Sequence, residues 1–277
     1  MTVLQKRLTP TGEIVSQDTR FASLTDAVAE EPELGVYLVS NTMNGGKVFM
    51  LDAHFDRLER SAAALGVTVT VPRVQLRKIL QSMLAEAGFG DGRFRISVAA
   101  DTPGVFLVSM EKFTGLPAEL LNQGIVCRTG RKGERNDPSV KSTHWLHARR
   151  ELTGDDVFEY LLCDDEDRIL EGTSSNFFAV VRGVLRTAGA GVLSGITRKA
   201  ILELANDVLP VEQVAIPCAE LGSVSEAFIT SSTRGVVPVR RIDSVEIGTP
   251  GPVTRDLEAR FRHWQQEHLE PLQRFGY

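Results

Sequence analysis

Lys141, Glu171 and the run Gly195-Ile196-Thr197 are residues of this chain whose types and order could do chemistry together. Lys141 begins the phrase Lys-Ser-Thr-His-Trp-Leu, Glu171 lies in Leu-Glu-Gly-Thr-Ser-Ser-Asn, and the third run precedes Arg198. They offer, in that order, an amine nucleophile, a carboxylate and hydrogen-bond donors for an anion. What they do depends on the elements that position them.

The anion site is expected at the start of a helix, because residues 198–208 carry apolar side chains at helical spacing. Free backbone N–H groups and the positive end of the helix dipole converge at such a start. The Ile196 N–H and the Thr197 hydroxyl therefore suit a phosphate. The alternative is that Thr197 is an ordinary helix cap with nothing bound.

Glu171 is predicted to end a hairpin made of a strand at 157–163, an acidic turn at 164–167 and a return strand at 168–170. The polar loop 172–176, which includes Ser175, follows and can orient the carboxylate. A carboxylate in this place can keep a pyridinium nitrogen protonated, which makes the ring a better electron sink. The alternative is a surface glutamate beside a solvated turn.

Lys141 can form a Schiff base with an aldehyde only as a neutral amine, so its surroundings must lower its pKa from about 10.4. The neighbouring Trp145 and Leu146 allow partial burial. The alternative is a solvated surface lysine. The spacing of the amine, the carboxylate and the anion site together predicts a pyridoxal phosphate site.

Two further phrases accompany these three. They are Ala-His-Phe-Asp-Arg-Leu at 53–58 with Ser61-Ala62, and Ala-Phe-Ile-Thr-Ser-Ser-Thr at 227–233 before Val237-Pro238-Val239. As a set, the phrases resemble the class IV aminotransferases, the fold-type IV pyridoxal phosphate enzymes. That family includes branched-chain aminotransferases, D-amino acid aminotransferases and aminodeoxychorismate lyase. The resemblance extends from about Gly35 to Asp243.

The resemblance implies an α+β fold of two domains, a small one at 1–118 and a larger, β-rich cofactor-binding one at 119–277. It implies pyridoxal 5′-phosphate as cofactor and a homodimer as the assembly. By resemblance, Lys141 is the catalytic residue that forms the Schiff base and moves the proton. The remaining cofactor-binding residues are then Arg57, Glu171, Ser175, Ile196, Thr197, Ser231 and Ser232.

The implied activity is transfer of an amino group from an amino acid or amine to a keto acid. Tyr37 matches an aromatic residue that lines the family's substrate pocket, and Arg95 and Arg234 are candidates for binding a substrate carboxylate. The chain departs from better-known members because the strand end near Asp101 lacks the usual arginine-glycine pair, and the phrase after Lys141 lacks the usual asparagine. A lyase of the aminodeoxychorismate lyase type therefore stays an alternative.

Two readings from other classes are a catalytically silent binding or scaffold protein of this fold and a hydrolase with a Ser or Cys nucleophile. Lys141 and Glu171 argue against the first. No Gly-x-Ser-x-Gly elbow supports the second.

The composition excludes several other classes. The chain has 277 residues, a net charge of −5 and no basic footprint for nucleic acid. No apolar run approaches a membrane span, and the N-terminus lacks a secretory core, so we expect no membrane partner and a cytoplasmic location. The three separated cysteines and the isolated pair His144 and His147 predict neither a disulfide framework nor a metal site.

The hydrophobic pattern predicts the remaining elements. Helices are expected at 54–65, with Asp52 as cap, at 74–87 and at 255–269. Residues 111–122 are a candidate interdomain connector, and 130–139 a loop. Strands are expected at 35–42, 47–51, 93–99, 105–110, 124–129, 177–181, 184–187, 211–217, 227–231 and 236–242.

Overall fold

The computed structural model describes residues 3–18, 21–131, 137–149, 152 and 157–273. The chain forms two compact units. The first comprises Met1–Thr114, Val140–Ala148 and Gln266–Tyr277, and the second comprises Gly115–Ser139 and Arg149–Gln265.

This division differs from the expected continuous domains at 1–118 and 119–277. The first boundary falls at 114/115, and two later segments join the first unit. Backbone pairing explains both additions. The Tyr37 N–H donates to the Lys141 carbonyl at 3.0 Å, and Leu269 pairs with Phe49. Lys141 therefore belongs to the unit that also holds Tyr37, Arg57 and Arg95.

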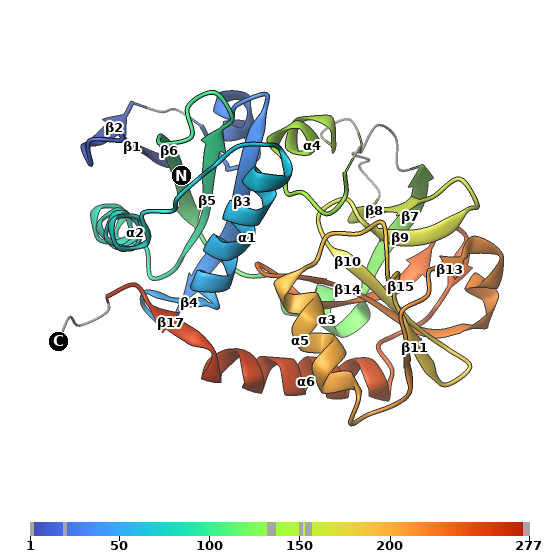
Figure 1. Ribbon diagram of the computed structural model, residues 1–277. Helices are drawn as coiled ribbons and strands as arrows, with labels where there is room; N and C mark the ends of the chain where they lie inside the picture. Colours follow the sequence, from blue (N-terminus) through green and yellow to red (C-terminus); the bar gives the residue numbers. More distant parts are fainter. Residues whose placement is uncertain (1–2, 19–20, 132–136, 150–151, 153–156, 274–277) are drawn as a thin grey trace. The chain divides into compact units, whose positions relative to one another are not determined.

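The first unit is built on an antiparallel sheet with the strand order β17-β4-β3-β5-β6-β1-β2 (Figure 1). Two of its strands, β3 and β4, are joined by the expected turn, where Asn44, Gly45 and Gly46 have positive φ. The strands are β1 Leu4–Leu8, β2 Ile14–Gln17, β3 Gly35–Met43, β4 Lys47–Phe49, β5 Gly92–Ala99, β6 Phe106–Lys112 and β17 Leu269–Pro271.

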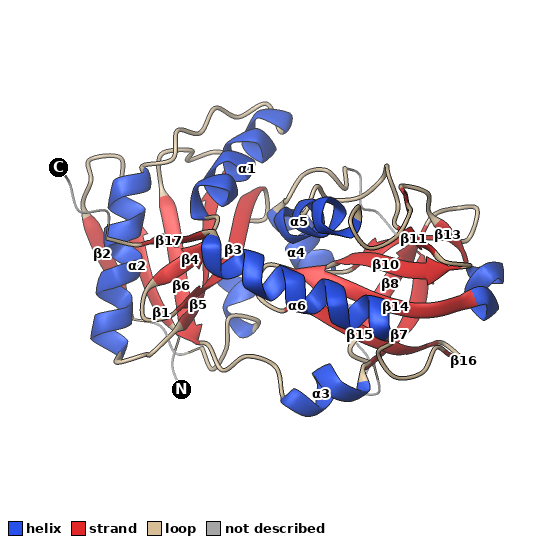
Figure 2. Cartoon of the chain, turned by 90° about the horizontal axis from the view of Figure 1, so that it is seen from below, coloured by secondary structure: helices blue, strands red, loops and turns tan. Residues whose placement is uncertain are grey.

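Two helices, α1 Leu51–Ala64 and α2 Arg73–Ala87, cover one face of this sheet (Figure 2). Phe55, Leu58 and Ala62 of α1 lie in the core because they repeat at helical spacing. The other face carries the short helix η1 Asp26–Glu30 and α4 Thr143–Ala148, which share a small core formed by Val28, Tyr37 and Leu146.

Asp52 was expected to cap α1, and this is wrong. The N-cap residue is Met50, in the left-handed region at φ 46°, and its side chain makes no capping hydrogen bond to the described residues. Asp52 instead forms ion pairs with Arg73 and Arg77 of α2. Helix α2 ends as expected, because Gly88 adopts the left-handed conformation that favours glycine, at φ 63°.

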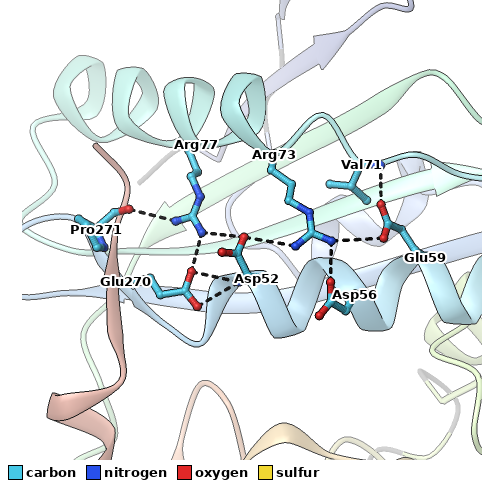
Figure 3. Close-up of polar contacts among 8 residues, drawn as sticks. All are labelled: Asp52, Asp56, Glu59, Val71, Arg73, Arg77, Glu270 and Pro271. Atoms are coloured by element: carbon cyan, nitrogen blue, oxygen red, sulfur yellow. Dashed lines mark hydrogen bonds and ion pairs between the residues drawn. The ribbon is translucent and has the colours of Figure 1, made fainter. Parts of the chain in front are cut away.

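A network of ion pairs joins α1, α2 and β17 (Figure 3). The Arg77 side chain is 5% exposed, and its Nη2 lies 2.9 Å from Asp52 Oδ1 and 2.5 Å from Glu270 Oε2. Arg77 Nη1 also donates to the Pro271 carbonyl at 3.0 Å. One turn earlier in α2, Arg73 pairs with three carboxylates of α1, those of Asp52, Asp56 and Glu59.

The second unit is built on a sheet with the order β12-β11-β10-β14-β15-β7-β8-β9-β13, to which β16 adds beside β15. A further pairing between β9 and β10 closes six of these strands into a ring, at the pair Glu171 and Asn176. The strands are β7 Ile125–Arg131, β8 Glu159–Cys163, β9 Arg168–Gly172, β10 Asn176–Val181, β11 Val184–Arg186, β12 Val211–Glu212, β13 Ile216–Pro217, β14 Val224–Ser231, β15 Gly235–Ile242 and β16 Val245–Glu246.

A hydrophobic core that includes Phe177, Ile229, Val237 and Leu161 occupies one face of this ring. Its helices are α3 Ala118–Gln123, α5 Ile196–Ala205, the short η3 Cys218–Ser223 and α6 Pro252–Glu267, which runs beside β14 and β15 (Figure 2). Arg182 and Gly183 form the expected two-residue turn, both with positive φ.

Some expected boundaries were wrong. The strand expected at 211–217 is two short strands, β12 and β13, because residues 211–212 pair with β11 and residues 216–217 with β9. The last helix ends at Glu267, since residues 269–271 pair with β4 as β17. Of the loop expected at 130–139, residues 132–136 lie outside the described residues. None of the helices within the described ranges is both long and apolar enough to cross a membrane.

Candidate active site

Lys141 is held by its backbone between a helix and a strand of the first unit. Its N–H donates to Ser61 Oγ on α1 at 3.3 Å, and its carbonyl accepts from Tyr37 on β3 at 3.0 Å. The next residue, Ser142, forms a bridge with Val36 of the same strand. The Lys141 side chain extends from this anchored backbone, and its Nζ lies 4.7 Å from the centre of the Tyr37 ring.

A buried cation, Arg57, lies on the same face of α1 as Ser61. Arg57 is 7% exposed, and its Nη2 lies 3.4 Å from His54 Nδ1 one turn earlier. Burial lowers the pKa of Arg57 to about 10, with Tyr37 acting in the opposite direction and Arg60 in the same one. No carboxylate of the described residues forms an ion pair with this guanidinium. Such a group suits an anionic ligand.

His54 completes this cluster as a neutral residue. It is fully buried, and burial, then the charges of Arg57 and Lys141, lowers its pKa well below 6.5. A neutral ring that accepts from Arg57 through Nδ1 carries its proton on Nε2, and Nε2 is buried with no hydrogen-bond partner among the described residues. We infer this tautomer from the contact with Arg57.

Arg95, a predicted substrate-binding residue, already has a carboxylate partner. It is 4% exposed, its Nε lies 2.6 Å from Glu31 Oε1, and its Nη2 donates to the Leu24 carbonyl at 2.9 Å. The Glu31 side chain is fully buried. Since both hydrogen bonds join β5 to the segment that contains η1, the structure favours a structural role for Arg95.

In the second unit, Glu171 lies in a row of polar residues that crosses three strands. Asn176 of β10 pairs with Glu171 of β9 on one side and with Thr230 of β14 on the other. Paired residues of antiparallel strands point to the same face, so all three side chains lie together. Glu171 is buried, and its Oε2 accepts from Asn176 Nδ2 and from the Leu193 N–H, both at 3.0 Å.

Helix α5 begins beside this row. Its N-cap, Gly195, has φ −65° and ψ 139°, which any residue can adopt. Glycine is required there by proximity, because a Cβ would lie 2.1 Å from Asn176 Oδ1. Within the part of the chain that the structure describes, the buried hydroxyls of Thr197, in the first turn, and of Thr230 have no hydrogen-bond partner. This helix start therefore offers N–H groups and an unsatisfied hydroxyl, the features expected of a phosphate site.

Arg198, in the same turn, is also buried, and its Nη2 donates to the Ala188 carbonyl at 2.7 Å and to Gln213 Oε1 at 3.1 Å. Burial lowers the pKa of Arg198, and the charge of Glu171 acts in the opposite direction. Arg198 thus adds positive charge near the Glu171 carboxylate.

The predicted residues Ser175, Ser231 and Arg234 belong to a second polar cluster, centred on Glu159 of β8. Ser175 Oγ donates to Glu159 Oε1 at 3.0 Å, and Arg234 Nη1 pairs with Glu159 Oε2 at 2.8 Å. Arg234 Nε donates to Ser231 Oγ at 3.0 Å. Strand alternation places Ser231 on the face of β14 opposite to that of Thr230. The predicted residue Ser232 follows directly, in the turn after β14.

The structure thus places Tyr37, Arg57 and Lys141 together in one unit, and Glu171, Ile196 and Thr197 together in the other. Sequence reasoning assigned no role to His54, Ser61, Asn176 or Glu159. A signal was present for two of them. His54 and Ser61 share a helix face with Arg57, three residues before it and four after it.

Comparisons with known proteins identify the family. The family model for amino-transferase class IV matches residues 38–242. A D-alanine aminotransferase of Listeria monocytogenes is 27% identical over 254 residues, which span 82% of this chain and 85% of that protein. An aminodeoxychorismate lyase of Bacillus subtilis is 28% identical over 239 residues, or 78% and 81% of the two chains.

Solved structures with a similar fold belong to the same family. A solved structure of the branched-chain aminotransferase of Thermoproteus uzoniensis with norvaline aligns with a TM-score of 0.78, over 99% of this chain and 100% of that one, at 22% identity. Another branched-chain amino acid aminotransferase, solved with pyridoxamine 5′-phosphate, aligns with the same TM-score of 0.78. This likeness shows the α+β fold of fold-type IV enzymes. Since the family model also covers most of the sequence, this chain belongs to the class IV aminotransferase family.

Proposed function

We propose that this chain transfers an amino group from an amino acid or amine to a keto acid, with Lys141 as nucleophile and proton carrier. The observation that carries this proposal is the cluster on α1 and β3. It anchors a lysine by its backbone and places a buried arginine without a carboxylate partner, among the described residues, on the same helix face.

Class IV aminotransferases are pyridoxal phosphate enzymes, and the described residues fit this cofactor. The buried Arg57 guanidinium and the unsatisfied Thr197 hydroxyl each suit a phosphate. The buried Glu171 carboxylate suits a protonated ring nitrogen. We propose that these residues serve the same cofactor.

When bound, pyridoxal phosphate supplies a carbonyl that carries the amino group and a ring that withdraws electrons. The chain supplies the nucleophile and the proton transfers. Lys141 Nζ would take up the proton from the substrate α-carbon as a general base and then deliver it, as a general acid, to the carbon that carried the carbonyl group. The anchored Lys141 backbone limits the positions that Nζ can reach, which keeps this transfer directed.

Glu171 would keep the ring nitrogen protonated, and its hydrogen bonds from Asn176 and Leu193 hold the carboxylate in orientation. For the phosphate we assign Arg57, the Ile196 N–H and Thr197. Within the turn that follows β14 we assign Ser232, because Ser231 lies on the face of β14 opposite to Thr230 and the row that contains Glu171. Tyr37, whose ring lies beside Lys141 Nζ, would line the substrate pocket.

We also propose that the chain acts as a homodimer, as the family resemblance implies, and size-exclusion chromatography with light scattering tests this. The cytoplasmic location stays a prediction.

The visible absorbance of the reconstituted protein tests the function. Wild type mixed with pyridoxal phosphate should show the band of a lysine-bound cofactor, and a panel of L- and D-amino acids should bleach it selectively. Lys141→Ala should lack the band, while Lys47→Ala, which removes an exposed lysine of the same unit, should keep it. A normal band in Lys141→Ala would refute the role of Lys141. A colourless wild type would favour a silent binding protein of this fold.

A second candidate function, a lyase, is supported by the Bacillus subtilis relative. Turnover without a keto acid separates the two activities. An aminotransferase stops after one turnover when no acceptor is present, because the amino group stays on the enzyme. A lyase needs no acceptor and continues. We expect a single turnover with an amino donor alone and many turnovers once a keto acid is added.

A further inference from the structure

Glu159 is a buried carboxylate to which the proposed mechanism gives no task. It begins β8, is 5% exposed and shares a strand face with Leu161, which belongs to the core. Its Oε1 accepts from four groups of the loop that follows Glu171. They are the Ser174 N–H at 2.5 Å, the hydroxyls of Ser174 and Ser175 at 3.0 Å, and the Thr173 hydroxyl at 3.4 Å. Gly172 fits above it only because it has no Cβ, which would lie 2.6 Å from Oε1.

The other oxygen of Glu159 holds Arg234. Burial raises the pKa of Glu159, but the charge of Arg234 and the hydrogen bonds from Ser174, Arg234 and Ser175 outweigh it, so the pKa lies below its usual value. The carboxylate is therefore charged at neutral pH. A charged pair with this many donors fixes the groups around it more firmly than neutral contacts do.

Arg234 uses the rest of its guanidinium to join two loops. Nη2 donates to Ser174 Oγ at 2.8 Å, and Nε donates to Ser231 Oγ at 3.0 Å. The guanidinium also lies over the Phe158 ring, 5.4 Å from its centre. Ser231 and Arg234 are the two ends of the turn that presents Ser232, since the Arg234 N–H bonds to the Ser231 carbonyl at 3.4 Å.

We infer that Glu159 and Arg234 are positioning residues that hold the Ser232 turn and the loop after Glu171 at a fixed separation. This inference rests on the proposed function, because the turn carries Ser232, which is assigned to the phosphate, and the loop directly follows Glu171, which is assigned to the ring nitrogen. The two residues make different contacts. Arg234 holds the turn through Ser231 and also bonds to Ser174 Oγ, whereas Glu159 holds Arg234 and accepts most of the hydrogen bonds from the loop after Glu171.

The test compares the affinities for pyridoxal phosphate and for pyridoxal, which lacks the phosphate, by fluorescence titration. Arg234→Lys keeps a positive charge for Glu159 but loses the Nε donor to Ser231 and the Nη2 donor to Ser174. Glu159 still holds Ser174 through its own hydrogen bonds. It should bind pyridoxal phosphate about tenfold more weakly, the effect of one good hydrogen bond, and bind pyridoxal as wild type does. Ser231→Ala removes the acceptor of the same hydrogen bond and should have the same effect, and the two changes together should cost no more than either alone.

Glu159→Gln should weaken the binding of both ligands, because it releases both loops. Glu212→Gln is the matched control, since Glu212 forms an exposed pair with Arg186 in the same unit, at 2.9 Å, away from both loops. It should leave both affinities unchanged. Equal losses for both ligands in Arg234→Lys would indicate a structural role only and overturn the inference, as would no loss for either. A wild type that binds neither ligand would refute the proposed function itself and the inference with it.

Discussion

The neutral, buried His54 predicts a specific dependence of stability on pH. Burial and the charges of Arg57 and Lys141 keep the His54 pKa well below 6.5 in the folded protein. In the unfolded chain the same residue takes up a proton with a pKa of about 6.5. The unfolded state therefore binds more protons below pH 6.5, and stability falls as the pH drops through that value.

The size of the effect follows from proton linkage. At pH 5.5 the unfolded histidine is about 90% protonated, and at pH 7.5 about 10%. If the folded ring stays neutral throughout, this residue alone lowers the free energy of unfolding by about 1.4 kcal/mol between pH 7.5 and pH 5.5. The contribution is fully present above the unfolded pKa and is lost progressively below it.

Urea unfolding at both pH values measures this directly, in wild type, in His54→Gln and in His144→Gln, which replaces an exposed histidine of the same unit. The comparison is made within each variant, so a constant cost of the substitution cancels. His54→Gln should lose about 1.4 kcal/mol less than wild type on acidification, and His144→Gln should behave as wild type does. An equal loss in wild type and His54→Gln would refute the neutral buried histidine.

Three further substitutions test other parts of the fold and site. Arg77→Met should lower the free energy of unfolding by about 2 kcal/mol in urea titrations, less than for a fully buried pair because Asp52 and Glu270 are partly exposed. Arg262→Met, which removes an exposed pair with Glu258, should change it by less than about 0.5 kcal/mol. Equal effects would contradict the importance of the network. Gly195→Ala should lower the free energy of unfolding by about 1–3 kcal/mol and weaken cofactor binding, because the new Cβ displaces Asn176 from Glu171. Gly222→Ala should do neither, because no described atom lies within 4 Å of its new Cβ. A Gly195→Ala protein with normal stability and affinity would show that Asn176 can move freely. Arg57→Gln should weaken pyridoxal phosphate binding by about 10- to 100-fold, as the loss of a charge-assisted hydrogen bond does. It should leave pyridoxal binding unchanged. Similar losses of affinity for the two ligands would place the phosphate elsewhere.

Much of the fold could be predicted from the sequence, where a local pattern decides the element. The helix at 74–87 and its end at Gly88 follow from apolar spacing and one glycine, and α2 spans Arg73–Ala87. The turn at Arg182-Gly183 likewise depends on adjacent residues. Elements that depend on distant partners were missed. Strands β1 and β17 are short and polar, and they are strands because β6 and β4 accept them as partners.

The same distinction applies to the candidate site. Lys141, Glu171 and the start of α5 stand in recognisable phrases, and the structure gives each a position that suits its predicted role. The ion pairs of Arg95 and Arg234 could not be predicted from the sequence, because their partners Glu31 and Glu159 are 64 and 75 positions away. A charged residue on a strand looks the same whether it awaits a ligand or is already paired.

The discontinuous composition of the first unit has a consequence for the order of events during synthesis. Its edge strand β17 pairs with β4, whose residues leave the ribosome about 220 positions earlier. At a synthesis rate of roughly 5–20 residues per second, on the order of 10–40 seconds pass between the synthesis of β4 and that of β17. During that interval the edge of β4 is open to other chains, and Arg77 lacks the Glu270 carboxylate. The second unit, whose strands are nearer in sequence, can complete its ring first, so the lysine-bearing unit is the one whose nascent form most needs protection from aggregation.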